Sequence, residues 1–252
     1  MAEKVIILTG ASRGIGQAIA QYLLSRNHKL VVISRTLSAL DQLRSQYPDH
    51  VEVLAGDLSD LSLGPKAVEL AVTRWDRLDG VIVNHGTLNP VKKVADSSAE
   101  EWRKSFDVNV FSALSIITPA IPHLRRTHGR IILTSSGASL NAYQSWGAYG
   151  ASKAVLNHLA LTLAVEEPDI TTVSVRPGVV DTEMQREIRE KHRDAMSAKD
   201  AEKFAGLKSR GVLLRPEQPG HVIARLAVEA AKELSGRFVN WNDESLGPLR
   251  GE

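Results

Sequence analysis

Short runs rich in β-branched residues recur along this chain, and longer segments with helical spacing of apolar residues separate them. Because these runs are nearly continuous in apolar residues, they are typical of strands that helices cover on both faces. Six such runs begin at Val5, Lys29, Val51, Gly80, Arg130 and Thr171, and a seventh begins at Gly236. The alternation predicts an α/β fold, with one doubly wound, seven-stranded parallel sheet and helices on both of its faces.

The domain organisation follows from the same rhythm. No repeat, linker or low-complexity tract interrupts it, so we expect residues 1–252 to form a single domain. A charged segment at 181–216 is longer than the other connections. It is either a solvated pair of surface helices or, over about 182–215, a mobile substrate lid, since insertions at the carboxyl edge of a parallel sheet overhang the ligand site.

Composition excludes several classes of protein. The 31 basic and 29 acidic side chains give a net charge of +2 and are scattered along the chain, so we do not expect nucleic acid as a partner. The chain has no cysteine, which excludes disulfide scaffolds, thiolate metal sites and cysteine nucleophiles, and we expect no metal. The apolar run at Val5 is too short for a spanning helix and poorly flanked for a signal peptide, so we expect a cytoplasmic protein without a membrane partner.

The sequence TGASRGIG directly follows the first predicted strand and precedes a helical pattern. Glycines at such a place let the backbone turn tightly and approach a pyrophosphate, whose charge the N–H groups at the helix start can bind. The alternative is a glycine-rich turn without a ligand, but the order of strand, loop and helix favours a dinucleotide-binding Rossmann fold. The loop residues expected at the cofactor are Gly10, Ser12, Arg13, Gly14, Ile15 and Gly16.

The end of the second predicted strand bears on which cofactor binds. NAD-binding enzymes usually place an acidic residue there for the adenine ribose, whereas this chain has Ser34 and Arg35. Arg35 offers a fork of donors to a 2′-phosphate, and Arg13 can reach the same phosphate from the glycine loop. Each arginine alone is equally explained as a solvated surface residue, but together they predict NADPH/NADP+. Asp57 is expected either to accept a hydrogen bond from the adenine amino group or to cap a helix before Leu58.

Tyr149 and Lys153 lie four residues apart in a stretch with helical spacing, so they share one face of a helix. An adjacent ammonium favours the phenolate and is expected to move the tyrosine pKa toward the range of a general acid or base. A tyrosine and a lysine four residues apart are common on helices by chance, so the prediction of a catalytic site depends on further polar residues. Ser135 and Ser136 end the fifth strand, where a hydroxyl can bind a substrate carbonyl, and Asn109 lies in an apolar helix, either functionally or as a satisfied core asparagine.

The stretch after the sixth strand completes the set. Pro177 and Gly178 in RPGVVDT are expected to turn the chain beside the nicotinamide end of the cofactor, where Thr182 would contact its amide. Trp146, one turn before Tyr149, is expected to line an apolar substrate wall. The other candidates for that wall are Tyr143, Leu88, Val179 and Met184, and plain core packing explains each of them equally well.

Together these motifs resemble the classical short-chain dehydrogenases/reductases as far as Thr182. The resemblance implies Tyr149 as proton donor, Ser136 orienting the carbonyl, Lys153 lowering the tyrosine pKa and holding the nicotinamide ribose, and Asn109 ordering a relay water. An interval of 13 residues to Tyr149 selects Ser136 over Ser135. The resemblance also implies cofactor contacts at Leu58, Asn84, Gly86, Tyr149, Lys153, Pro177, Gly178, Val180 and Thr182.

One departure from the family is His85, which stands in the NHG turn where the family usually has alanine and leaves the local packing in doubt. The stretches SSGASLNAYQSWGAYGASKAVLNH, VEEPD and WNDESLGP look like fungal carbonyl reductases of the benzil reductase type, relatives of sepiapterin reductase. The resemblance further implies a homodimer or homotetramer joined through the helices that carry Asn109 and Tyr149.

The expected reaction is NADPH-dependent reduction of a ketone or α-diketone, with a small apolar or aromatic carbonyl compound as substrate. Three alternatives stay open at this point. The first alternative is a redox-sensing regulator that binds NADP(H) without turnover, and the second is an alcohol dehydrogenase that works in the oxidative direction. An epimerase or dehydratase of the extended branch would need a larger C-terminal domain than the 70 residues after Thr182.

Overall fold

A computed structural model describes residues 2–250 and forms one parallel sheet from seven strands in that range. The strands are β1 Val5–Thr9, β2 Lys29–Ser34, β3 Val51–Ala55, β4 Gly80–Val83, β5 Arg130–Thr134, β6 Thr171–Arg176 and β7 Phe238–Asn240. Their order is β3-β2-β1-β4-β5-β6-β7, and every neighbouring pair is parallel. The predicted fold class is therefore confirmed.

The winding of the chain reverses at β1. Ile7 pairs with Val31 of β2 on one side and with Val81 of β4 on the other. The carboxyl ends of β1 and β4 consequently lie side by side at the switch point, where open α/β sheets leave a crevice for ligands.

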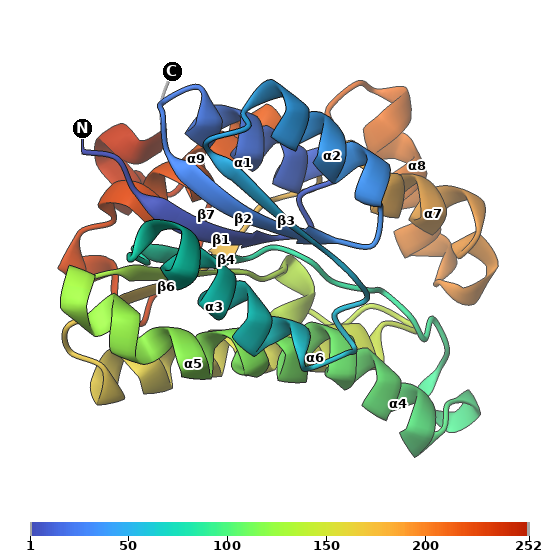
Figure 1. The fold of residues 1–252 in the computed structure, drawn as a ribbon. Coiled ribbons are helices and arrows are strands. Elements are labelled where there is room, and N and C mark those ends of the chain that lie inside the picture. Colours follow the sequence, from blue (N-terminus) through green and yellow to red (C-terminus); the bar gives the residue numbers. More distant parts are fainter. Residues whose placement is uncertain (1, 251–252) are drawn as a thin grey trace.

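Two helical layers cover the sheet (Figure 1). Alternate side chains of each strand supply the two cores, so that Ile6 and Leu8 pack toward one layer while Val5 and Ile7 pack toward the other. The first layer consists of α1 Gly14–Leu24, α2 Leu37–Gln46 and α9 Glu217–Glu229. The second consists of α3 Leu63–Trp75, α4 Ala99–Phe106, α5 Ser112–Thr127 and α6 Gly147–Glu166.

A π-helix at Asp107–Phe111 joins α4 to α5 and carries the buried Asn109. The sequence predicted a plain helix here, but a wider turn forms instead. Such π-turns occur often at functional sites. The helical run at 99–127 has the length and hydropathy of a membrane-spanning helix, but 44% of its most apolar stretch is buried within the molecule, where side chains such as Ile116 and Leu124 pack in the core beneath the second helical layer.

The charged segment after β6 folds into α7 Glu183–Glu190 and α8 Ala198–Ser209, at the end of the molecule away from both termini (Figure 1). Its Ile188, Met196 and Phe204 side chains are buried in one cluster with Trp146 and Tyr149, so the segment is more than a solvated helix pair. Its two ends meet, because Val180 bridges to Leu214, Asp181 N donates to Leu214 O at 2.8 Å and Leu214 N donates to Val179 O at 3.0 Å.

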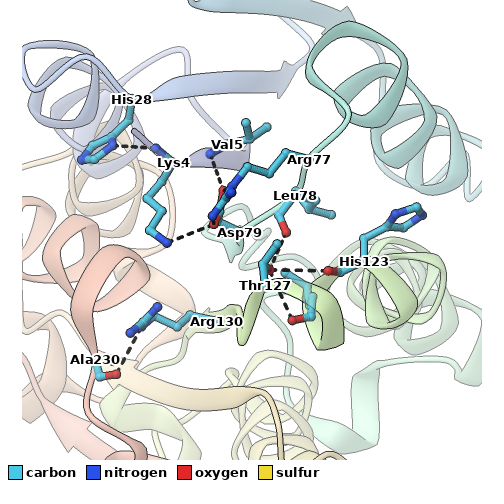
Figure 2. Close-up of polar contacts among 11 residues, drawn as sticks. Lys4, Val5, His28, Arg77, Leu78, Asp79, His123, Thr127, Arg130 and Ala230 are labelled. Carbon is cyan, nitrogen blue, oxygen red and sulfur yellow. Dashed lines mark hydrogen bonds and ion pairs between the residues drawn. The ribbon is translucent and has the colours of Figure 1, made fainter. Parts of the chain in front are cut away.

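A buried carboxylate fastens the opposite, amino edge of the sheet (Figure 2). The Asp79 side chain is 1% exposed and accepts hydrogen bonds from Arg77 Nε and Nη2, both at 2.7 Å, and from Lys4 Nζ and Val5 N, both at 3.0 Å. Burial alone would raise the pKa of Asp79, but these donors outweigh it and hold the pKa below its ordinary value. The carboxylate thereby ties the start of β1 to the start of β4.

Candidate active site

The glycine loop after β1 forms a cradle at the start of α1. Gly10 and Gly14 have φ values of +68° and +54°, and a Cβ at Gly16 would lie 2.0 Å from the Gly10 carbonyl oxygen. No acidic residue lies in the first turn of α1, and no side chain caps its N-terminus. Because the first N–H groups of a helix have no partner within it, this cradle suits a phosphate group.

The turn after β4 is tied to the end of β1. Thr9 Oγ1 accepts a hydrogen bond from Asn84 N at 2.9 Å and lies 2.8 Å from His85 Nδ1. His85 Nε2 lies 2.8 Å from Val108 O and 2.7 Å from Ser112 Oγ, so this ring bridges the turn to the π-helix. Burial and the nearby Lys153 ammonium lower the pKa of His85 to about 4, which keeps the ring neutral at neutral pH.

The Asn109 side chain is fully engaged within the protein. It accepts from Thr87 N at 2.8 Å and donates to Thr87 O at 2.9 Å and to Ser152 Oγ at 3.0 Å. Ser152 in turn donates to the Tyr149 carbonyl at 2.8 Å. Asn109 therefore joins the turn beside Gly86, the π-helix and α6 at one point.

Helix α6 places Tyr149 and Lys153 together, both buried. Lys153 Nζ donates to the Thr134 carbonyl at 2.8 Å and lies 5.9 Å from the centre of the Tyr149 ring. Burial lowers the pKa of Lys153 to about 8. The hydroxyl of Ser135 donates to Lys153 O at 3.2 Å, whereas the neighbouring Ser136 interacts with the Tyr149 phenol.

The direction of the Tyr149 pKa differs from the sequence prediction. Burial raises the pKa of Tyr149, and hydrogen bonding with Ser136 opposes this without reversing it. The expectation that Lys153 would lower it is wrong for this structure, because desolvation of the phenolate dominates. The phenol is accordingly protonated at neutral pH.

A pocket of about 140 Å³ opens beside the Tyr149 phenol. Trp146 lies edge-on to Tyr149, with ring centres 6.0 Å apart, and stacks on Phe204 of α8 at 5.3 Å. The predicted wall is brought together here, since the lining includes Ser136, Leu88, Tyr143, Trp146, Val179 and Met184. The sequence did not single out two polar residues of the lining, Arg176 and Gln185.

The turn after β6 lies beside the glycine loop. Gly178 has a φ of +81°, and a Cβ there would lie 2.6 Å from a Leu214 methyl group. A Cβ on Gly14 would lie 3.1 Å from Thr182 Cγ2, so Thr182 lies directly against the cradle. Pro177, Gly178, Val180 and Thr182 also line the pocket, as does Ile15 of the loop.

The residues expected at the adenine end lie apart from the pocket. Arg13 and Arg35 are exposed, and Arg35 Nη1 lies 3.9 Å from an Asp57 carboxylate oxygen. Ser34 is buried, and its hydroxyl accepts from Thr36 N at 3.2 Å. Asp57 accepts from Ser59 N at 2.9 Å in a turn.

The predicted helix cap at Asp57 is wrong, because α3 begins only at Leu63. Leu58, which the cap was expected to precede, is buried in the core between the sheet and the second helical layer.

Comparison with known proteins assigns the family. Residues 4–193 match the short chain dehydrogenase family. An uncharacterized oxidoreductase of Schizosaccharomyces pombe is 43% identical over 95% of this chain and 97% of its own. The benzil reductase ((S)-benzoin forming) of Saccharomyces cerevisiae is 38% identical over 98% of this chain and 99% of its own.

A solved short-chain dehydrogenase/reductase from Saccharomyces cerevisiae superimposes with a TM-score of 0.95 at 37% identity, covering 98% of this chain and 99% of the other. Members of this family use nicotinamide dinucleotides as cofactors. The chain is therefore an oxidoreductase of the short-chain dehydrogenase/reductase family.

Proposed function

We propose that this protein is an NADPH-dependent carbonyl reductase that acts on apolar or aromatic ketones and α-diketones. The observation that carries the proposal is the buried phenol of Tyr149, which together with Ser136 lines an otherwise mainly apolar pocket. A neutral phenol can give a proton to a developing alkoxide, which is the requirement for reduction. The benzil reductase relative supports the choice of diketones.

The cofactor's place is inferred from the cradle at Gly10, Gly14 and Gly16 together with Thr182, whose backbone and small side chains fit a pyrophosphate. When bound, NADPH supplies a hydride for the carbonyl carbon. Further contacts are proposed at Ser12, Ile15, Asp57, Leu58, Asn84, Gly86, Pro177, Gly178 and Val180.

The chain's own residues then have distinct tasks. Ser136 and Tyr149 would hold the carbonyl oxygen, and Tyr149 would protonate it as the carbon is reduced. Lys153, held on the Thr134 carbonyl, would bind the ribose and help Tyr149 regain its proton. Asn109 would keep the turn at Gly86 and helix α6 in register, and its relay water stays a prediction.

The preference for NADPH over NADH rests on Arg13, Ser34 and Arg35. Both arginines are exposed at the carboxyl edge of the sheet, and no acidic residue directly follows β2. A 2′-phosphate would find two guanidinium groups there, and it would replace the exposed Asp57 carboxylate, 3.9 Å away, as the partner of Arg35. We expect the KM for NADPH to lie well below the KM for NADH. Arg35→Glu should reduce the ratio of KM for NADH to KM for NADPH by about tenfold or more. Equal Michaelis constants for the two cofactors in the wild type would refute it.

The segment at 182–215 is proposed as a lid. Its Ala195 carbonyl accepts from Ser145 Oγ at 2.6 Å and from Gln144 Nε2 at 3.1 Å, and Lys203 Nζ donates to the Tyr143 hydroxyl at 3.1 Å. These contacts, together with the stacking of Phe204 on Trp146, would hold the segment over the pocket when it is closed. Substrate exchange would require them to break.

A homodimer or homotetramer is also proposed. Large apolar side chains are exposed on the second helical layer, with Val165 83% and Leu161 53% exposed on α6. Phe111 and Leu114 are exposed beside the start of α5. We expect light scattering to show an oligomer for the wild type and a smaller species for Leu161→Glu, because the new charge would disrupt the apolar interface.

We also propose that the protein lies in the cytoplasm. Imaging of a tagged chain in cells would test this.

The deciding experiment measures the oxidation of NADPH in the presence of benzil through the loss of NADPH absorbance. Steady turnover with formation of benzoin supports the reductase. Tight NADPH binding without turnover on any carbonyl compound would favour the regulator, and turnover only from alcohol and NADP+ would favour the oxidative direction.

A further inference from the structure

Arg176 ends β6, and its side chain reaches the pocket that contains Ser136 and Tyr149. The guanidinium lies against Gly137, because a Cβ added there would be 2.9 Å from both Arg176 Cζ and Nε. Gly137 directly follows Ser136 in the chain. The guanidinium therefore lies next to the residue expected to hold the reacting carbonyl.

This guanidinium differs from the other half-buried arginines. Within residues 2–250, four arginines are half-buried, and three of them have a partner. Arg130 donates to Ala230 O, Arg189 to Gln185 Oε1 and Arg225 to the Tyr22 hydroxyl. In the same range, Arg176 forms no side-chain hydrogen bond or ion pair.

The pocket around this group has no charge to balance it. Among the described residues, its lining contains no aspartate or glutamate, and most lining side chains are apolar or aromatic. A half-buried guanidinium without an acceptor leaves up to five N–H donors unsatisfied by the protein, and such a group favours ligand oxygens. The remaining surface favours an apolar body on the same ligand.

We propose that Arg176 binds a second oxygen of the substrate, beside the carbonyl that Ser136 and Tyr149 hold, and thereby selects dicarbonyl compounds over simple ketones. The proposal rests on the proposed reductase function. The chemistry it reads is an acceptor oxygen on the carbon next to the reacting one, as in a 1,2-diketone or a 2-oxo acid. Gly137 is part of the device, since any side chain there would displace the guanidinium.

The test compares three substrates that share a phenyl group: phenylpropanedione (a diketone), benzoylformate (an oxo acid) and propiophenone (a simple ketone). Each is measured with NADPH in wild type, in Arg176→Met and in Arg126→Met, whose exposed arginine lies on α5 outside the pocket lining. Comparing the same substrate across variants cancels the greater intrinsic reactivity of the diketone.

We expect Arg176→Met to lower kcat/KM about tenfold to hundredfold for the diketone, the oxo acid or both, since hydrogen bonds to charged groups have that weight. Propiophenone should change less than about threefold, and Arg126→Met should leave all three unchanged. If kcat/KM falls for only one of the two dicarbonyl compounds, Arg176 binds the ketone oxygen of the diketone or the carboxylate oxygen of the oxo acid accordingly. An equal loss on all three substrates, or no loss on any, overturns the proposal.

Gly137→Ala provides a second route that keeps the charge. Its methyl group should push the guanidinium aside and produce the same selective loss, which keeps the proposal testable if Arg176→Met folds poorly. Calorimetric titration of benzoylformate into the NADPH complex gives a readout without turnover. If the wild type reduces none of the substrates, the reductase proposal fails, while weaker benzoylformate binding by Arg176→Met still supports this one and unchanged binding overturns it.

Discussion

The two edges of the sheet each bury a charged side chain, and they treat it in opposite ways. At the amino edge, Asp79 receives four hydrogen bonds, two from Arg77 and one each from Lys4 and Val5, and its pKa is held down (Figure 2). At the carboxyl edge, the buried Lys153 ammonium has the Thr134 carbonyl as its hydrogen-bond partner within residues 2–250, and burial lowers its pKa to about 8. The first arrangement stabilises a charge, whereas the second leaves a charge destabilised where chemistry is expected.

Each edge of the sheet also has a surface pocket, and the larger of the two pockets is not the one at which we expect chemistry. The hollow at the amino edge, lined by charged side chains such as Glu3, Lys29 and Arg74, has about 630 Å³, against about 140 Å³ for the pocket at Tyr149. Of these two hollows, the smaller one is lined by the buried Tyr149 and by mainly apolar side chains. We therefore assign chemistry by the side chains that line a hollow and not by its volume.

Tyr149→Phe tests the carboxyl edge most severely. We expect kcat to fall about a thousandfold, since removing a general acid costs 10²–10⁴-fold, while the free energy of unfolding changes by less than about 1 kcal/mol. NADPH oxidation and thermal unfolding measure the two effects. Tyr47→Phe is the matched control, because Tyr47 packs against the first helical layer's core outside the pocket lining, and we expect this change to lower kcat less than about threefold. Comparable losses in both variants would contradict the assigned role.

Asp79→Ala tests the amino edge. Removing the carboxylate leaves Arg77, Lys4 and Val5 N without their acceptor, so we expect the free energy of unfolding to drop by about 3 kcal/mol. Well below the unfolding temperature, kcat/KM should stay near wild type. Asp41→Ala removes an exposed carboxylate paired with Arg44 and should change stability by less than about 0.5 kcal/mol. A large loss of activity in the folded Asp79 variant would show that the two edges are not independent.

Lys153→Met should have the opposite effects to Asp79→Ala: a higher free energy of unfolding and a lower activity. Replacing a buried ammonium by an apolar chain of similar length should raise the free energy of unfolding by about 1–2 kcal/mol at neutral pH, after allowance for the lost bond to Thr134. Reductase activity should fall sharply. Denaturant unfolding of this variant beside Lys104→Met, an exposed lysine, measures the difference. Destabilisation as large as that of Asp79→Ala would mean that Lys153 supports the fold.

The pH dependence of stability gives the smallest effect. Folded Lys153 loses its proton near pH 8 but an unfolded lysine only near 10.5, so between these values the unfolded chain binds more protons and stability rises with pH. We expect wild type to gain about 1 kcal/mol between pH 8 and 9 relative to Lys153→Met. Asp79 has a lowered pKa, so its contribution is present above its unfolded value and is lost as pH falls through the folded one. Parallel curves for wild type and Lys153→Met would contradict the lowered lysine pKa.

The strands and helices followed directly from local patterns. Each predicted run from Val5 to Thr171 starts at the residue where a strand begins, because buried parallel strands are apolar on both faces. The spacing of Tyr149 and Lys153 likewise fixed their shared helical face. These features depend on neighbours in the sequence, which is why sequence patterns predict them.

Features that depend on distant contacts were not predictable in this way. The π-turn at Asn109 is held by Thr87 and Ser152, which lie 22 and 43 residues away in sequence. The raised pKa of Tyr149 depends on burial, which the spacing of Tyr149 and Lys153 does not reveal. Arg176 gave no signal because an unpaired guanidinium is recognised only once its surroundings are known. His85 did stand out by its position, but its bridge to Ser112 needed the three-dimensional arrangement.

The pairing of Val180 with Leu214 has a consequence for how this enzyme can change over evolution. Since the 33 residues between them leave and rejoin the body at one place, the length and sequence of that excursion can vary without moving β6 or α9. Loop-closure entropy grows only slowly with length, so a longer excursion that keeps the packing of Phe204 on Trp146 would add little to the entropic cost of folding. The segment that we propose as a lid is thus an exchangeable module, and grafting a relative's segment between Val180 and Leu214 is a direct route to test whether it sets substrate preference.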